Sequence, residues 1–81
     1  MTTLTPALCR AARAYLGWSQ DRLSRKARVG TSTIADFERG ARSPQDATLK
    51  AIRDTLDAAG VGFFPIKRYG RHGLAMMVDR Q

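Results

Sequence analysis

The sequence predicts a mainly α-helical fold of four to five short helices, followed by a short C-terminal β-hairpin. Before Gly60, four segments space their apolar residues at helical intervals and are bounded by capping residues or glycine. After Gly60, two short apolar runs flank a polar, glycine-containing stretch, which is typical of a hairpin. The length of 81 residues suits one small domain, so we expect a helical part over 1–60 and a hairpin extension over 61–81.

The first helix is predicted over Pro6–Leu16. Thr5 is a good N-cap, and proline fits the first helical position because its missing N–H has no helical partner there. Gly17 ends the segment as a residue after a helix commonly does. The inner face is predicted to hold Cys9, Ala12 and Leu16.

Two further short helices follow, joined by a tight turn at Val29-Gly30. Ser19 is expected to cap the first of them, from about Gln20 to Arg28, with Leu23 and Ala27 inward. The other is expected from about Thr31 to Arg39, with an inner face formed by Ile34 and Phe37.

A fourth helix is predicted after Ser43-Pro44. Ser43 can cap it, and Asp46 then lies near the positive end of the helix dipole. The helix is expected to run to about Ala59, with inner residues Leu49, Ile52 and Leu56.

The hairpin is predicted from two apolar strands, Val61–Ile66 and Leu74–Val78, with a basic loop between them. Pro65 restricts the first strand to an edge or shortens it. The basic loop has three open interpretations. It contacts flanking DNA phosphates or a minor groove, it is a solvated hairpin tip, or it flanks a dimer interface.

Composition narrows the class of partner. The 14 Lys and Arg against 7 Asp and Glu give a net charge of +7, which suits a nucleic acid or an anionic membrane. A membrane-surface helix needs a wide apolar face opposite a basic one, whereas the fourth helix mixes Asp54 with Lys50. The N-terminus lacks the features of a signal peptide, so we expect a soluble cytoplasmic protein.

Catalytic and metal sites are not indicated. The single cysteine, Cys9, excludes an intrachain disulfide and a paired-cysteine metal site. We interpret it as a small buried hydrophobe rather than a redox sensor. The sequence offers no nucleophile–base pairing and no phosphate-cradling glycine loop, so we expect no enzyme activity, no metal and no cofactor.

The two short helices and their turn form a helix-turn-helix arrangement, in which the second helix can enter a DNA major groove. This part of the chain resembles the XRE family, which includes the lambdoid phage repressors and Cro proteins. The resemblance covers roughly Cys9 to Leu56 and is carried by Gly17-Trp18-Ser19-Gln20, Leu23, Ala27, Ser32-Thr33-Ile34 and Phe37-Glu38-Arg39-Gly40.

The resemblance implies a role for individual residues. The second helix of the pair is the recognition helix, and its base-contacting candidates are Thr31, Ser32, Ala35 and Asp36. The phosphate-contacting candidates are Ser19, Gln20, Thr33, Arg39 and Arg42. Arg13 and Glu38 match an ion pair that ties the first helix to the third.

The sequence departs from the family pattern at two of these positions. Gly30 stands where a Ser or Thr cap is usual, and Asp36 stands where Gln, Arg or Lys is common. A carboxylate facing DNA is repelled by phosphates, so Asp36 either accepts from a cytosine amine or pairs with a neighbouring Arg. The charge-rich run from Arg22 to Arg28 is also compatible with a plain solvated helix face.

The function predicted from these features is a sequence-specific transcriptional regulator that binds double-stranded DNA, and repression is the expected mode. We expect a homodimer on a palindromic operator with half-sites about 34 Å apart. The dimer interface is predicted in the hairpin, at Phe63, Phe64, Met76 and Val78, because an isolated hairpin would expose too much apolar surface. An antitoxin-type module that binds DNA and a protein partner through the same region is the alternative.

Overall fold

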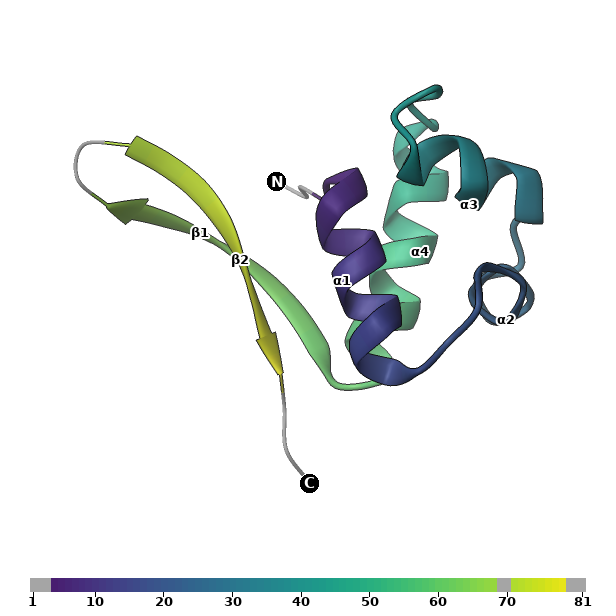
Figure 1. The fold of residues 1–81 in the computed structure, drawn as a ribbon, viewed down its shortest axis with the longest axis horizontal. Helices are drawn as coiled ribbons and strands as arrows, with labels where there is room; N and C mark the ends of the chain where they lie inside the picture. The colour runs from purple at the N-terminus through teal and green to yellow at the C-terminus, as the bar shows by residue number, and fades with distance from the viewer. Residues whose placement is uncertain (1–3, 69–70, 79–81) are drawn as a thin grey trace.

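The computed structural model describes residues 4–68 and 71–78, and within 65–68 and 71–78 it describes the backbone alone. In that part of the chain, four helices pack together and two strands form an antiparallel hairpin (Figure 1). The predicted fold class is therefore confirmed. The elements are α1 (Pro6–Leu16), α2 (Gln20–Ala27), α3 (Thr31–Glu38), α4 (Asp46–Ala58), β1 (Val61–Arg68) and β2 (Arg71–Val78).

The ends of α1 and the start of α2 follow the sequence signals. Thr5 Oγ1 accepts from the Leu8 N–H at 3.1 Å, and Pro6 occupies the first helical position. Gly17 ends α1 with a φ of 72°, a left-handed conformation that costs glycine little. Ser19 Oγ accepts from the Arg22 N–H at 3.0 Å and so caps α2.

The predicted start of α4 is wrong. The helix begins at Asp46 and its N-cap is Gln45, not Ser43. The reason is tertiary. The ring of Pro44 is buried, and Gln45 keeps an extended backbone with a ψ of 157°, so helical geometry starts two residues later than the capping signal suggests. Asp46 still lies in the first turn, where its charge complements the helix dipole.

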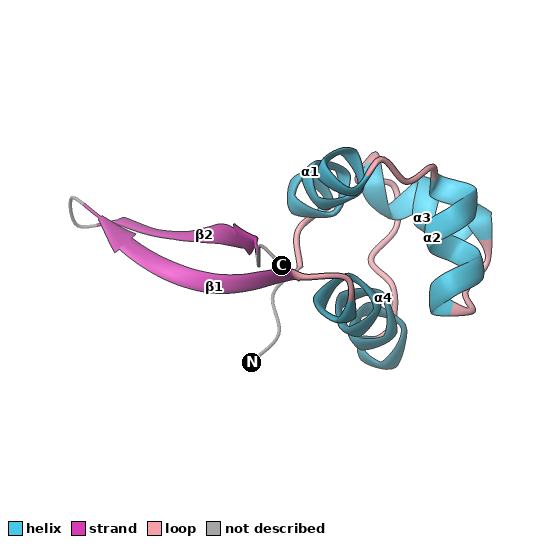
Figure 2. Ribbon diagram, turned by 90° about the horizontal axis from the view of Figure 1, so that it is seen from below, coloured by secondary structure: helices cyan, strands magenta, loops and turns pink. Residues whose placement is uncertain are grey.

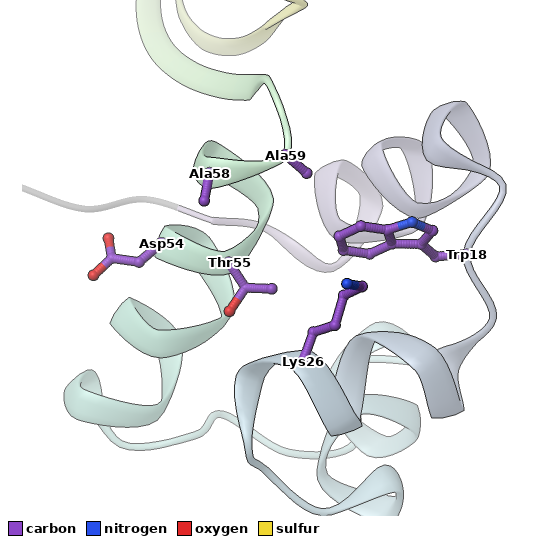
Figure 3. Close-up of a pocket in the computed structure, with 6 residues that line it drawn as sticks. All are labelled: Trp18, Lys26, Asp54, Thr55, Ala58 and Ala59. Carbon is purple, nitrogen blue, oxygen red and sulfur yellow. The ribbon is translucent and has the colours of Figure 1, made fainter.

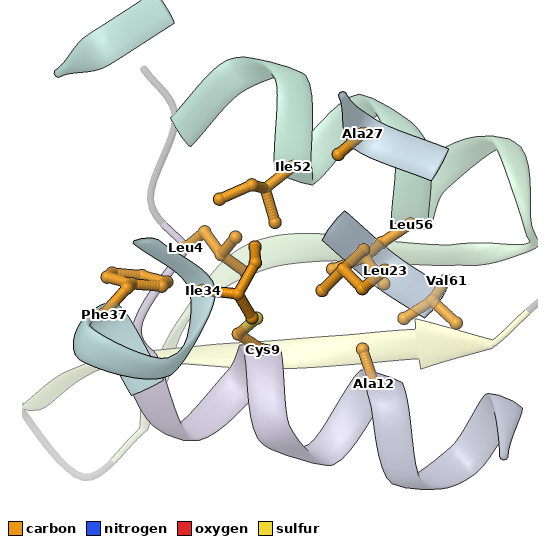
Figure 4. Packing of buried hydrophobic residues seen from close by; sticks show 10 residues of the cluster. All are labelled: Leu4, Cys9, Ala12, Leu23, Ala27, Ile34, Phe37, Ile52, Leu56 and Val61. Atoms are coloured by element: carbon orange, nitrogen blue, oxygen red, sulfur yellow. The ribbon is translucent and has the colours of Figure 1, made fainter. Parts of the chain in front are cut away.

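The core lies between the four helices and the first residue of β1 (Figure 4). The predicted inner residues of α2 and α3 are buried, whereas Leu16 and Leu49 are half-buried at its margin. Leu4 and Val61 complete the core, although neither was predicted from helical spacing. The residues of the hydrophobic core are Leu4, Cys9, Ala12, Leu23, Ala27, Ile34, Phe37, Ile52, Leu56 and Val61.

The hairpin strands are longer than predicted. Pairing continues from Val61↔Val78 to Arg68↔Arg71, so Lys67, Arg68, Arg71 and His72 belong to strands rather than to a loop. Backbone hydrogen bonds hold a ladder whatever the charge of its side chains, which is why a polarity pattern underestimates strand length. Pro65 does not shorten β1, because in a two-stranded sheet β1 is an edge. Tyr69 and Gly70 lie outside the described residues.

The hairpin leaves the helices on the side opposite α2 and α3 (Figures 1 and 2). β1 contacts α4, and β2 contacts α1. The outer surface of α3 and the hairpin are therefore separated by the helical body. None of the helices in the described part of the chain is long and apolar enough to cross a membrane.

Candidate nucleic-acid interface

The turn between α2 and α3 sets the angle of the third helix. Arg28 follows α2 with a φ of 60°, the one positive φ at a non-glycine position among the described residues. The Val29 N–H returns to the Ser24 carbonyl at 3.0 Å, and the Gly30 carbonyl then accepts from the Thr33 and Ile34 N–H groups. Three residues, Arg28 to Gly30, therefore reverse the chain between the helices, and the half-buried Val29 packs against the core.

Hydroxyl groups bind the two helices together behind this turn. Ser24 is buried, donates to the Asp21 carbonyl at 2.8 Å, and has its Oγ 2.9 Å from Thr31 Oγ1. The Thr31 hydroxyl also donates to Asp21 Oδ1, at a distance of 3.3 Å. The hydroxyl of Thr31, a predicted base-contacting residue, is thus engaged with α2.

The first turn of α3 presents Ser32 to solvent. Ser32 is exposed, while Thr33 and Ala35 are half-buried on the same helix. Their side chains are short, so the α3 backbone can approach a groove closely. A hydroxyl and a methyl group are the chemistry available here for a base edge and a thymine methyl.

The end of α3 carries an ion cluster around Asp36. Asp36 Oδ1 accepts from Arg39 Nη2 at 2.7 Å, and Asp36 Oδ2 lies 3.9 Å from Arg42 Nη2. Arg42 Nη1 also lies 3.5 Å from Thr33 Oγ1. Of the two interpretations of Asp36, the structure contains the arginine pairing. Both guanidinium groups remain more than half exposed, at 68% and 53%, so they can still meet an anion.

A buried ion pair fixes α3 against α1. Arg13 donates through Nε and Nη2 to the two carboxylate oxygens of Glu38, each at 2.8 Å, and Glu38 is only 2% exposed. Gln20 Nε2 donates to Glu38 Oε1 at 3.0 Å, and Cys9 Sγ donates to Glu38 Oε2 at 3.1 Å. Arg13 also donates to the Trp18 carbonyl at 2.9 Å, which holds the loop before α2.

This network shifts the pKa of each ionisable member. Burial by itself would raise the pKa of Glu38, but hydrogen bonds from Arg13, Gln20 and Cys9 lower it below the ordinary value of a glutamate. The hydrogen bond to Glu38 raises the pKa of Arg13. Burial, and then the hydrogen bond to Glu38, raise the pKa of the Cys9 thiol. The carboxylate is therefore ionised, and the thiol stays protonated.

A polar hollow of about 440 Å³ lies beside the turn, between the starts of α3 and α4. Its wall includes Gly30 and Gln45, the N-caps of these two helices, and neither cap bonds to the helix through a side chain within the described residues. Arg28 and Arg42 also line the hollow. Uncapped N–H groups and guanidinium groups together suit a phosphate.

The geometry can be compared with known families at this point. A family model described as helix-turn-helix matches residues 10–59, more than half of the chain. The chain belongs to the XRE family of helix-turn-helix proteins. No curated protein matches it as a relative. The family is one of DNA-binding transcription regulators, so this XRE-family chain is a DNA-binding transcription regulator. The matched region contains α2 and α3 complete and stops before the hairpin.

Sequence reasoning missed part of the polar hollow in this XRE-family protein. Arg28 was assigned only to a charge-rich helix, and Gln45 and Thr48 were not selected. The hollow forms where the α2–α3 turn meets the α3–α4 loop, two segments that sequence patterns treat separately. Gly30 was the available signal, because a glycine N-cap has no side chain that could accept from the N–H groups at the start of α3.

A second hollow, of about 600 Å³, lies between α2 and the end of α4 (Figure 3). The half-buried Trp18 forms one wall and packs against the core. Lys26 Nζ lies 5.3 Å and Arg22 Cζ 5.8 Å from the centre of its ring, within cation–π range. Two cations of the charge-rich α2 therefore cover the tryptophan instead of projecting freely. The other lining residues are Asp54, Thr55, Ala58 and Ala59.

Proposed function

We propose that this XRE-family regulator is a sequence-specific repressor that binds a palindromic operator as a homodimer, with α3 in the major groove. The observation that supports this most directly is the first turn of α3. There the exposed Ser32 precedes Thr33, which lines the hollow together with Arg28 and Arg42, and Arg42 also belongs to the arginines around Asp36. A hydroxyl suited to a base edge thus lies beside cationic groups suited to phosphates.

Ser32 and Ala35 are the residues we assign to base contacts. A serine hydroxyl can donate or accept at a base edge, and an alanine methyl can contact a thymine methyl. Thr31 orients the start of α3 through its hydrogen bonds to α2, and its methyl group remains for an apolar contact. Asp36 holds the arginines in place rather than contacting cytosine, because a carboxylate already paired by Arg39 gains little from a cytosine amine.

The phosphate contacts form two groups. Ser19 and Gln20 lie at the N-terminus of α2, where their side chains bond within the fold and each keeps a further donor hydrogen for a phosphate oxygen. Thr33, Arg39 and Arg42 form the other group, beside the polar hollow. Contacts on both sides of α3 would fix its orientation in the groove.

Repression requires only that the protein occupies its operator. A protein that binds an operator overlapping a promoter excludes polymerase from that DNA. A net charge of +7 on 81 residues favours rapid association with DNA and a strong dependence of affinity on salt.

The test is selection of duplexes from a random pool by the purified 81-residue chain at near-physiological salt. Enrichment of one palindromic sequence is the expected result. Unselective binding that disappears as salt rises would overturn the proposal, because charge alone would then account for the affinity.

Two variants separate the proposed roles of base and phosphate contacts. Ser32→Ala should lose about 1–3 kcal/mol of discrimination at one operator position. Arg42→Ala should instead weaken binding to all sequences and reduce the slope of log K against log salt by about one. An unchanged operator preference in Ser32→Ala would show that the base-contacting face lies elsewhere.

A further inference from the structure

The hairpin has one covered face and one open face. Alternation along β1 places Val61 and Phe63 on the face toward the helices, where Val61 is fully buried and Phe63 half-buried. Phe64 lies on the opposite face and is 38% exposed. By register, Ile66, Ala75 and Met77 share the face of Phe64. A two-stranded hairpin is marginal by itself, and additional strands stabilise it.

The register determines which backbone groups of the hairpin point outward. Arg68 and Arg71 flank a connection of two residues, and such a flanking pair exchanges both of its hydrogen bonds. Hydrogen-bonded and non-hydrogen-bonded pairs then alternate along the ladder, so Pro65↔Leu74 is a non-hydrogen-bonded pair. The position where Pro65 lacks an N–H therefore faces away from β2, so the proline removes no hydrogen bond from the ladder between β1 and β2.

The two outer edges of the hairpin consequently differ. The edge of β1 lacks a donor at Pro65, in the middle of the strand, and proline on an edge blocks the addition of another strand. β2 contains no proline. Its outward-facing backbone groups belong to His72, Leu74, Met76 and Val78, and each of these residues has both a donor and an acceptor. β2 is therefore the edge that can accept a strand.

A second copy of β2 fits this edge in charge as well as in hydrogen bonding. An antiparallel arrangement about a two-fold axis places the basic end of one β2, at Arg71 and His72, beside the apolar end of the other, at Met77 and Val78. A parallel arrangement would place the basic ends together, and like charges opposite each other are destabilising. The register centred on Ala75 is the one in which all four outward-facing residues of each strand find a partner.

We propose that two copies of the chain join through their β2 strands, antiparallel and centred on Ala75, to form a four-stranded sheet in the order β1-β2-β2-β1. This inference rests on the homodimer of the proposed function and names its interface. The sheet leaves α3 of each copy uncovered, because the hairpin lies on the opposite side of the helical body (Figure 2).

The test uses two matched proline exchanges in the 81-residue chain. Leu74→Pro removes the outward N–H of β2 but keeps the ladder within the hairpin. Pro65→Val restores the outward N–H of β1 and leaves β2 untouched. Analytical ultracentrifugation gives the dimer dissociation constant, and circular dichroism confirms that the helices persist. We expect Leu74→Pro to weaken the dimer by about 30-fold or more, as two lost intermolecular hydrogen bonds imply, and Pro65→Val to leave it unchanged.

A cysteine variant tests the register. Oxidation of Ala75→Cys should give a disulfide-linked dimer, since non-hydrogen-bonded partners across antiparallel strands approach closely enough for a disulfide. The wild-type chain is the control, because its own cysteine, Cys9, is buried. Phe64→Cys, on β1, should not cross-link efficiently.

The outcomes separate this proposal from the proposed function. A dimer that survives Leu74→Pro, a dimer strengthened by Pro65→Val, or a wild-type chain that is monomeric at high concentration would each overturn the β2 pairing. If the wild-type chain is monomeric, the hairpin is available to bind a different protein. If the dimer depends on Leu74 but selects no DNA sequence, the pairing stands and the proposed function fails.

Discussion

Glu38 illustrates how one residue joins the core to the candidate interface. Its carboxylate is buried and accepts from Arg13 on α1, from Gln20 at the start of α2 and from the Cys9 thiol. A buried charge is tolerated only when it is paired and hydrogen-bonded, and here both oxygens are satisfied. Gln20, a proposed phosphate contact, is therefore positioned by the same carboxylate that anchors α3.

Glu38→Gln should destabilise the fold by about 3 kcal/mol, because it leaves the mostly buried Arg13 without its counter-ion. Chemical denaturation at pH 7 measures the loss. Asp54→Asn is the matched control. It removes an exposed ion pair with Lys50 and should change stability by less than about 1 kcal/mol. Equal effects of the two substitutions would contradict the buried-pair interpretation.

The same carboxylate should make stability depend on acid. The pKa of Glu38 is lowered in the folded chain, so the unfolded chain binds more protons as pH falls below the ordinary glutamate pKa of about 4.3. The stabilisation is complete above that value and is lost as pH falls through the folded pKa. Denaturation midpoints measured from pH 6 to pH 3 should fall less steeply for Glu38→Gln than for the wild-type chain. Parallel curves would contradict this assignment.

Cys9 should be chemically inert while the chain is folded. The thiol is fully buried and its pKa is raised, so the reactive thiolate is scarce at neutral pH. We expect modification by a disulfide reagent at pH 8 to proceed at the rate of opening of the fold and to accelerate sharply in denaturant. Rapid labelling of the native chain would instead support a redox role.

At the scale of the elements, the start of α3 is less stabilised than the starts of α1 and α2. Thr5 and Ser19 cap their helices through side-chain oxygens, whereas Gly30 has no side chain to offer. Gly30 has an ordinary φ of −67°, and a Cβ placed there would meet Thr33 Oγ1 at 3.6 Å, a normal contact. The conformation of this turn therefore does not require glycine.

Gly30→Ser should stabilise the fold by about 1 kcal/mol, through a new cap and a less flexible unfolded chain. Gly30→Ala shares the second effect but is a poor N-cap, so it should be close to neutral. Thermal denaturation of the two variants measures the difference. Gly17→Ser provides the opposite control, since the φ of 72° at that position should make it destabilising. If serine and alanine behave alike at Gly30, no cap has formed.

At the scale of the molecule, the proposed DNA contact and the proposed self-association occupy opposite sides. The α2–α3 pair lies on one side of the helical body and the hairpin on the other (Figure 1). In the proposed dimer, the antiparallel strands place the two helical bodies at opposite ends of one sheet. Both recognition helices are then held by a common two-fold axis, and the operator must match that symmetry.

The spacing of the operator half-sites should therefore be rigid. Inserting about 5 base pairs, half a helical turn, between the half-sites should rotate one of them to the far side of the duplex and reduce affinity to that of a single half-site. Gel-shift titrations of the selected operator and of the insertion measure this. Equal affinities would mean that each copy binds independently.

The sequence alone was sufficient for much of the helical framework. Thr5, Pro6, Gly17 and Ser19 act within one turn of the chain, so the ends of α1 and the start of α2 follow from local chemistry. The inner faces of α2 and α3 likewise follow from helical periodicity. The match to the helix-turn-helix family model covers this same region.

The tertiary structure decided what depends on residues far apart in the chain. Burial of Pro44 moved the start of α4, and burial of Val61 joined the first residue of β1 to the helical core. The polar hollow exists only where two turns meet, and strand pairing converted the predicted basic loop into ladder positions. Sequence by itself determined the local elements and the family, because caps and periodicity act over a few residues. Packing determined the site and the open edge of β2, because these depend on which segments become neighbours.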